Sequence, residues 1–228
     1  MINRHFIRIF IIVAIFFLFS VYCDIIADAE ASGKIIRKAG KNQVALTFDD
    51  GPKNTHTLYT DMLLSVLKSK DVKATFFVLG RDVESNPSDL IKIYDAGHVI
   101  ANHAYSHNSL ASMDYDEIVE ELRDCNKLVE VITGKRPRYV RPPTGKYNPL
   151  VLKAFNDENL TMVYWTNNPG DYHGWESGKI LAEEILRCRG PGDIILLHLG
   201  VYETIEAVDI IIDAYREAGF EFVTVEQI

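Results

Sequence analysis

Apolar and polar residues alternate along most of the chain in a pattern that predicts short strands separated by helices. From Gln43 onward, short apolar runs follow one another, and segments with helical spacing of apolar residues lie between them. The strand-like runs are Val44–Phe48, Ala74–Val78, His98–Ala101, Tyr139–Val140, Met162–Trp165, Ile194–Leu197 and Phe220–Val225. The helical segments are Thr57–Lys68, Pro87–Ala96, Asp114–Ile132, Pro149–Asn156, Ser177–Arg187 and Thr204–Ala218. Strands that alternate with helices predict parallel β/α units.

Charged residues and histidines follow the carboxyl ends of five of these runs. In chain order they are Asp49 and Asp50, His103 and His107, Arg141, Asp171, and His198. In a barrel of parallel strands the carboxyl ends share one face, and active sites are built there. An open, doubly wound sheet is the alternative. A closed or nearly closed barrel explains better why these strands direct ionisable residues to one rim.

Two adjacent carboxylates, Asp49 and Asp50, stand where the first strand ends and Gly51-Pro52 turns the chain away. Adjacent carboxylates repel each other and are costly to bury unless a cation or a donor compensates them. One interpretation is a metal ligand beside a catalytic base. The other is an Asp-rich turn in which both side chains accept hydrogen bonds from backbone amides.

His103 and His107 are four positions apart, so a helical turn would place both imidazoles on one side. With Asp50 they would form a three-ligand site with an open position, which is typical of a catalytic divalent metal, and these ligand types suit zinc. The alternative is that the histidines only bond to the backbone. The presence of Asp50 on the same rim favours the metal site.

Two ion pairs are expected at the same rim. A buried Arg141 needs a carboxylate, for which Asp49 is the candidate, and Asp171 would hold the tautomer of His198 and favour its protonated form. The alternatives are a surface arginine and a core histidine bonded to a backbone carbonyl. Aromatic residues near the rim are a weaker hypothesis for stacking on sugar rings, since such residues more often belong to the core; they are Tyr105, Trp165, Tyr172 and Trp175.

The N-terminus has the features of a targeting segment. Arg4 and Arg8 precede an uncharged apolar run from Ile9 to Cys23, which has about the length of a signal-peptide core and is short for a membrane span. We expect residues 1–29 to be a signal peptide and the protein to be exported, either secreted or held in the cell envelope. An uncleaved anchor, through which alone the chain would contact a membrane, is the alternative. Residues 30–42 are polar and basic, and we expect a linker there.

Composition narrows the class of protein. The 228 residues are 47% hydrophobic and 25% charged, which is typical of a globular domain. The formal net charge of -8 argues against a nucleic-acid partner, because phosphate binding needs a basic face. Cys125 and Cys188 fall in separate helical patterns, so we expect free or partly buried thiols, and without a Cys-x-x-Cys pair a thiolate zinc site is excluded.

The residues at the rim stand in five motifs that follow one another in the sequence. They are Thr47-Phe48-Asp49-Asp50-Gly51-Pro52, His103-x-x-x-His107, Arg141-Pro142-Pro143, a looser segment centred on Asp171, and Leu196-Leu197-His198. In this order and spacing, residues 43–228 resemble a polysaccharide deacetylase domain of the NodB-homology class, carbohydrate esterase family 4 (CE4).

This resemblance implies a distorted (β/α)7 barrel with its active site at the carboxyl ends of the strands. It also implies hydrolytic removal of acetyl groups from N-acetylated sugars with a divalent metal, by default Zn2+, with Co2+ as a further option. By position, the metal ligands would be Asp50, His103 and His107. Asp49 would be the general base, Arg141 its orienting partner, and His198 the general acid, tuned by Asp171. Leu196 and Tyr172 would contact the substrate, and the backbone amide of Thr144 would help to bind the oxyanion.

Several positions depart from the family pattern. Ala104 stands where Ser or Thr is usual, Thr144 replaces an aromatic residue or glycine, Tyr172 replaces a tryptophan, and Leu199 replaces a frequent Asp. These departures concern the substrate more than the catalysis. We expect a peptidoglycan or chitin-like glycan of N-acetylglucosamine or N-acetylmuramic acid units. The alternatives are an esterase for O-acetylated xylan and a catalytically silent carbohydrate-binding envelope protein.

Overall fold

A computed structural model describes residues 35–53 and 57–228 and contains a curved sheet of parallel strands. The strands are β1 (Ile35–Ile36), β2 (Gln43–Asp49), β3 (Thr75–Val78), β4 (Val99–Asn102), β5 (Tyr139–Val140), β6 (Thr161–Val163), β7 (Asp193–His198) and β8 (Glu221–Phe222). Their order is β1-β6-β5-β4-β3-β2-β7, and β8 joins β2. Strands β1 and β7 end this order, so the sheet is an open barrel. The predicted distorted barrel of parallel β/α units is confirmed.

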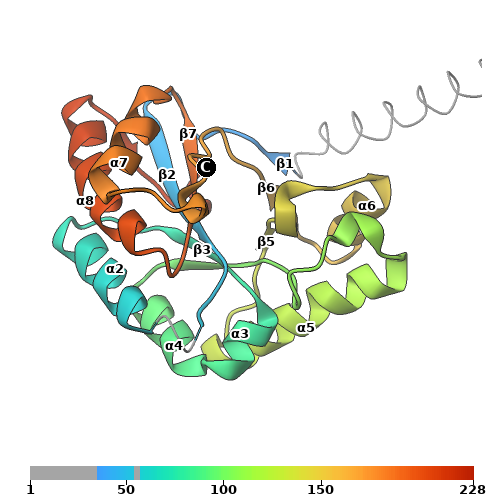
Figure 1. Cartoon of the computed structure of the whole chain (residues 1–228). Coiled ribbons are helices and arrows are strands. Elements are labelled where there is room, and N and C mark those ends of the chain that lie inside the picture. The colour runs from blue at the N-terminus through green and yellow to red at the C-terminus, as the bar shows by residue number, and fades with distance from the viewer. Residues whose placement is uncertain (1–34, 54–56) are drawn as a thin grey trace, which may run out of the picture.

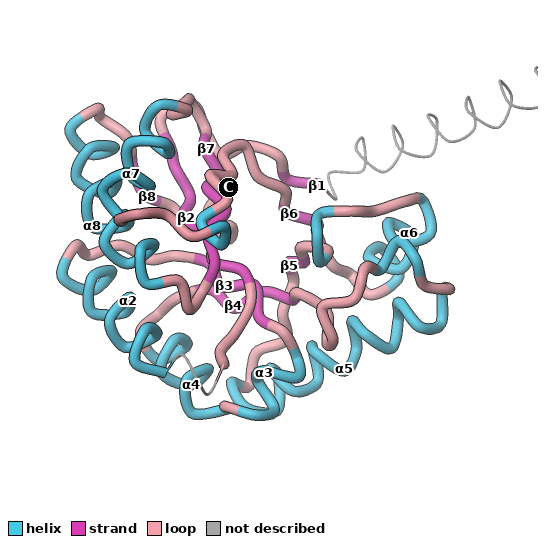
Figure 2. The backbone as a smooth tube through the Cα atoms, in the orientation of Figure 1, coloured by secondary structure: helices cyan, strands magenta, loops and turns pink. Residues whose placement is uncertain are grey.

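Helices cover the outside of this sheet (Figure 1; Figure 2). They are α2 (Thr57–Ser69), α3 (Gly80–Ser85), α4 (Pro87–Asp95), α5 (Tyr115–Thr133), α6 (Pro149–Asp157), α7 (Gly178–Arg187) and α8 (Tyr202–Glu217). Short 3-10 turns are η2 (Leu110–Ser112), η3 (Pro143–Gly145) and η4 (Asp171–His173). The longest helix, α5, begins at Asp114, whose side chain forms a capping box with Glu117, and ends at Gly134 in a left-handed conformation.

Alternation along β2 determines which residues reach the inside of the barrel. Val44, Leu46 and Phe48 join the apolar core formed with α2, α7 and α8. Ala45 belongs instead to a small inner cluster with residues of β3, β4, β6 and β7. Because side chains of a strand point alternately to its two faces, Asp49 lies on the same inner face as Ala45.

Some element predictions were wrong. Ile35–Ile36 fall in the expected linker but form β1, which pairs with Met162–Val163. The run Phe220–Val225 contains only the two residues of β8, and helix α3 was not predicted. Ile35–Ile36 stand within a polar, basic stretch and α3 has only six residues, so neither segment shows a periodicity.

The two cysteines behave as predicted, and both are free: Cys125 is buried in α5 and Cys188 is exposed. Across residues 35–53 and 57–228, none of the helices has the length and apolar character needed to cross a bilayer. The expected signal peptide, residues 1–29, lies outside the described residues.

Candidate active site

Asp49 and His198 are the last residues of neighbouring strands. β2 and β7 pair in parallel, and Asp49 stands in register with His198. Both side chains line a single cleft at the carboxyl ends of the strands. The alternation of the two strands therefore delivers a carboxylate and an imidazole to the same rim, side by side.

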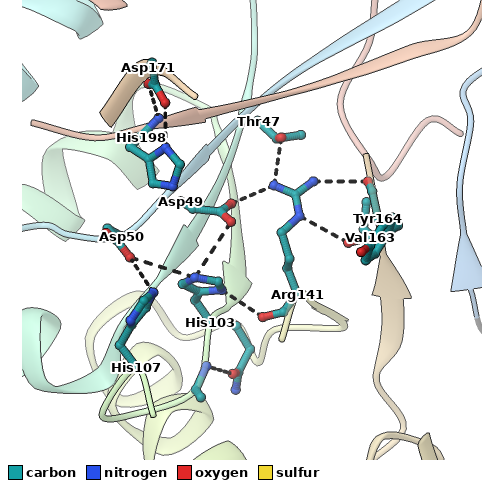
Figure 3. A network of polar contacts seen from close by, with 12 residues as sticks. Thr47, Asp49, Asp50, His103, His107, Arg141, Val163, Tyr164, Asp171 and His198 are labelled. Atoms are coloured by element: carbon teal, nitrogen blue, oxygen red, sulfur yellow. Dashed lines mark hydrogen bonds and ion pairs between the residues drawn. The ribbon is translucent and has the colours of Figure 1, made fainter. Parts of the chain in front are cut away.

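Arg141, the residue after β5, is completely buried and holds Asp49 (Figure 3). Its Nη1 donates to Asp49 Oδ1 at 2.6 Å and to Thr47 Oγ1 at 2.9 Å. Its Nε and Nη2 donate to the backbone carbonyls of Val163 and Tyr164. Burial lowers the pKa of Arg141, and the charge of Asp49 opposes this shift. The predicted pair of Arg141 and Asp49 is present, and the alternative of a surface arginine is wrong.

Asp50, His103 and His107 lie together at the next position along the rim (Figure 3). Their ligand-type atoms are all within 4.8 Å of one another, and Asp50 Oδ1 is 3.8 Å from His103 Nε2 and 3.4 Å from His107 Nε2. Two ligand atoms of one tetrahedral zinc ion are about 3.4 Å apart. Asp50 Oδ1 is also buried and accepts no hydrogen bond within the described part of the chain. A carboxylate oxygen buried without a donor fits a cation site.

The backbone fixes the tautomer of His103. Its Nδ1 lies 2.8 Å from the carbonyl oxygen of Arg141, and because a carbonyl only accepts, Nδ1 must carry a proton. Burial lowers the pKa of His103, against the opposing charges of Asp49 and Asp50. In the neutral ring the lone pair is then on Nε2, the atom nearest Asp50.

The connection between the two histidines differs from the prediction. Residues 103–109 form a loop rather than a helical turn, and Ala104 and His107 have φ values of 65° and 67°. Residues with side chains adopt this left-handed region reluctantly. Asp50 and Thr144 share it, with φ values of 67° and 63°. Four of the six described non-glycine residues with positive φ therefore belong to the segments that form the site.

Asp171, in η4, holds His198 through both of its oxygens. Oδ1 lies 2.7 Å from His198 Nδ1, and Oδ2 accepts from the backbone N–H of His198 and from the hydroxyl of Thr204, each at 2.7 Å. Burial alone would lower the pKa of His198, but the hydrogen bond and charge of Asp171 outweigh it, so the pKa is raised. The predicted Asp171–His198 pair is present.

The cleft at this rim has a volume of about 420 Å³. It is lined by Asp49, Asp50, His103, His107, Thr144, Gly145, Trp165, Asn168, Tyr172, Leu196 and His198. Eight of the ten predicted site residues are in this lining, and the other two, Arg141 and Asp171, are buried behind it. Sequence reasoning missed Gly145 and Asn168. A Cβ on Gly145 would lie 2.3 Å from a ring atom of Trp165, which explains the glycine; Asn168 carries no comparable sequence signal.

Of the four aromatic residues considered for stacking on sugar rings, two lie at the cleft. Trp165 and Tyr172 line the cleft, and Tyr172 lies edge-on to His198 at 4.8 Å between ring centroids. Tyr105 is not in the lining and donates its hydroxyl to Glu84. Trp175 is also outside the lining and packs against the main core.

Comparisons with known proteins agree with this geometry. Residues 36–163 match a family model described as polysaccharide deacetylase. A peptidoglycan-N-acetylglucosamine deacetylase of Bacillus cereus is 35% identical over 81% of this chain and 67% of its own length. The peptidoglycan-N-acetylmuramic acid deacetylase PdaA of Bacillus subtilis is 33% identical over 81% of this chain and 70% of its own. The solved structure of PdaA superposes with a TM-score of 0.80, covering 88% of this chain and 87% of PdaA.

The family also contains proteins without activity. A CE4 family pseudoenzyme from Bacillus anthracis is 30% identical over 85% of this chain and 68% of its own, with a TM-score of 0.79. A fold of this kind is therefore not sufficient for activity, and the residues at the rim have to be present and arranged. In this chain the predicted set stands together around one cleft. The chain belongs to the polysaccharide deacetylase family, and it is an enzyme of that class.

Proposed function

We propose that the protein is a metal-dependent N-deacetylase that acts on N-acetylglucosamine or N-acetylmuramic acid units of peptidoglycan. The observation that carries this proposal is the register pair of Asp49 and His198, which stand beside a three-ligand cluster in one cleft. Hydrolysis of an amide needs a base for the attacking water and an acid for the leaving amine. The two deacetylases of Bacillus described above favour peptidoglycan over chitin.

The residues of the cluster fit a divalent metal, by default zinc. Asp50 Oδ1 lacks a donor in the described part of the chain, and the Nε2 lone pair of His103 is directed to it by the bond from Nδ1 to Arg141 O. One carboxylate and two imidazoles are a ligand set that leaves an open position on zinc. When bound, the metal would polarise the acetyl carbonyl and lower the pKa of water.

Asp49 would accept the proton of the attacking water. Its Oδ1 is bonded to Arg141, and its Oδ2 lies 3.7 Å from His103 Nε2, on the side of the metal cluster. Arg141 compensates the buried charge and fixes the orientation of the carboxylate. The base is thus held next to the place where the water would bind.

His198 would protonate the leaving amine from Nε2, because Nδ1 is bonded to Asp171. The raised pKa of His198 keeps it protonated to a higher pH than an ordinary histidine. The backbone amide of Thr144 would donate to the oxyanion, and Leu196 and Tyr172 would contact the substrate from the cleft wall.

We also propose that the protein acts outside the cytoplasm. Residues 1–29 would be a signal peptide, as their charge and hydropathy suggest, and a peptidoglycan substrate would require export. The catalytic domain would extend from β1 rather than from Gln43, since Ile35–Ile36 are part of the sheet. Cobalt remains an alternative metal.

The test is acetate release by the purified protein after metal removal and addition of zinc or cobalt. Peptidoglycan, N-acetylglucosamine oligomers and acetylated xylan are offered side by side. Metal-restored release from peptidoglycan is expected. Release from xylan alone would make the protein an O-acetyl esterase, and binding of glycan without any release would make it a silent carbohydrate-binding protein.

A further inference from the structure

The loop between His103 and His107 is held by hydrogen bonds from two different helices. On one side, the first amides of α3 donate to it, from Gly80 to the carbonyl of Ala104 at 3.0 Å and from Arg81 to that of Tyr105 at 3.2 Å. On the other side, one oxygen of Glu121 in α5, Oε2, accepts from the amides of Tyr105 at 2.9 Å and Ser106 at 2.8 Å.

This loop depends on outside support for its shape. Ala104 and His107 are left-handed, which costs about 1–2 kcal/mol for each residue with a side chain. The Asn102 side chain supports the start of the loop, since its Oδ1 accepts from the Ala104 amide at 2.6 Å. Beyond Ala104 the only charged side chain that bonds to the loop backbone, among the described residues, is that of Glu121.

The surroundings of Glu121 show that these amides are its main partners. Glu117, Glu120 and Asp124 surround it on the same helix, and none of them can neutralise its charge. No ion pair of Glu121 with a lysine or arginine occurs in the described part of the chain. A carboxylate accepting two backbone amides makes charge-assisted bonds, which are stronger than neutral ones.

We propose that Glu121 is a positioning residue for the metal site. By accepting both amides, it holds the loop so that the His107 imidazole stays within reach of Asp50, 3.4 Å away. Glu121 is not part of the cleft lining and acts only through the loop. The inference rests on the metal-dependent function proposed above.

Four variants separate the reach of Glu121 from its charge. Glu121→Gln removes the charge but keeps an oxygen at the same distance. Glu121→Asp keeps the charge but withdraws it by one methylene, and Glu121→Ala removes both. Glu120→Ala is the matched control, because Glu120 is an exposed acid on the same helix that makes no described bond to the loop.

The first measurement is the dissociation constant for zinc and cobalt, by competition with a chromophoric chelator. Glu121→Asp and Glu121→Ala are expected to bind metal about 10- to 100-fold more weakly, as for other groups that orient metal ligands. Glu120→Ala should bind like the wild type, and Glu121→Gln should lose less affinity than Glu121→Asp and Glu121→Ala, because it keeps an oxygen within reach of both amides. Weak binding by Glu121→Gln with normal binding by Glu121→Asp would overturn the inference, because charge alone would then explain the effect.

The second measurement is hydrogen exchange of the Tyr105 and Ser106 amides in the metal-free proteins. Protection should persist in the wild type and in Glu121→Gln and disappear in Glu121→Asp and Glu121→Ala. Equal protection in all variants would overturn the inference whatever the metal does. If the wild type binds neither metal, the proposed function fails and Glu121 has no role at a metal site. Loss of amide protection in Glu121→Asp and Glu121→Ala alone would still show that Glu121 holds the loop.

Discussion

Asp49 and His198 occupy equivalent positions on adjoining strands but have opposite surroundings. The Asp49 side chain is 5% exposed and faces a buried cation, Arg141. The His198 side chain is 17% exposed and faces a buried anion, Asp171. Sheet geometry makes the two residues neighbours, and each is held by a partner of opposite charge behind the rim. The difference teaches that, if Asp49 and His198 act as proposed, the residues behind the rim would distinguish base from acid, since the two positions on the rim are equivalent.

The largest effect is expected where the proposed base is removed. Asp49→Asn should reduce acetate release by about 10²- to 10⁴-fold, because an amide cannot accept the proton of the attacking water. Glycan binding should be retained, since the side chain keeps its shape. Initial rates with saturating metal and a glycan co-sedimentation assay check this, and an unchanged rate would remove Asp49 from the role of base.

Removing the cation behind Asp49 should act on stability as well as activity. Arg141→Met leaves a buried carboxylate without its partner and should lower the free energy of unfolding by about 3–5 kcal/mol. Urea denaturation measures this. Arg138→Met is the control, because its pair with Glu226 is exposed and should matter little. Adding Asp49→Asn to Arg141→Met should recover part of the loss; a purely additive double variant would contradict the pairing argument.

Removing Asp171, the anion behind His198, should shift the alkaline limb of the pH profile of kcat/KM. The pKa of His198 is raised by Asp171, and the proposed acid is active when protonated, so activity should fall as the pH rises through that raised pKa. Asp171→Asn should move this alkaline limb of kcat/KM to lower pH, since burial alone lowers the pKa. At a pH above the pKa of His198, a decrease of that pKa by about one pH unit reduces the protonated fraction about tenfold.

A limb that stays in place in Asp171→Asn would show that another group limits the rate at high pH. Thr204→Val is a useful companion variant, since it removes the bond to Asp171 Oδ2 while leaving the bond between Oδ1 and His198. Its limb should not move to lower pH, because the charge of Asp171 and its bond to His198 remain.

The smallest effect is expected at the cleft wall. Tyr172 is 55% exposed and contacts His198 through its ring edge. Tyr172→Phe should change kcat/KM little, whereas Tyr172→Ala should lower it by roughly 2- to 10-fold, corresponding to the loss of about 0.5–1.5 kcal/mol of aromatic contact. Michaelis kinetics on glycan oligomers check this, and equal loss in both variants would point to the hydroxyl instead.

Much of the site could be predicted from the sequence because its residues stand at strand ends. Apolar runs identify β2 and β7, and parallel strands bring their carboxyl ends to one face, so Asp49 and His198 were expected on one rim. That they are register neighbours follows from the strand order of the folded sheet. The partners of Arg141 and His198 followed from the cost of burying charge. These inferences use only regular elements and elementary electrostatics.

The parts of the site that could not be predicted are the irregular loop backbone and the contacts made to it by helices outside the sheet. The spacing of His103 and His107 suggested a helical turn, but left-handed residues bring the two imidazoles together instead. Glu121 reaches the same loop from α5, 15 residues beyond Ser106, and no local pattern signals such a contact. Its two bonds depend on how helices pack outside the sheet.

The left-handed residues have a consequence for engineering this protein. Each of Asp50, Ala104, His107 and Thr144 would be relieved of strain by glycine, which adopts this conformation freely. A screen for thermostability alone would therefore select glycine at these positions. At Asp50 or His107 that substitution would remove a proposed metal ligand. The same trade-off acts in evolution, because strained residues at a site can lower stability while they support activity. Stabilising substitutions belong on the outer helices, and a thermostable variant with glycine at the rim should be suspected of having lost its chemistry.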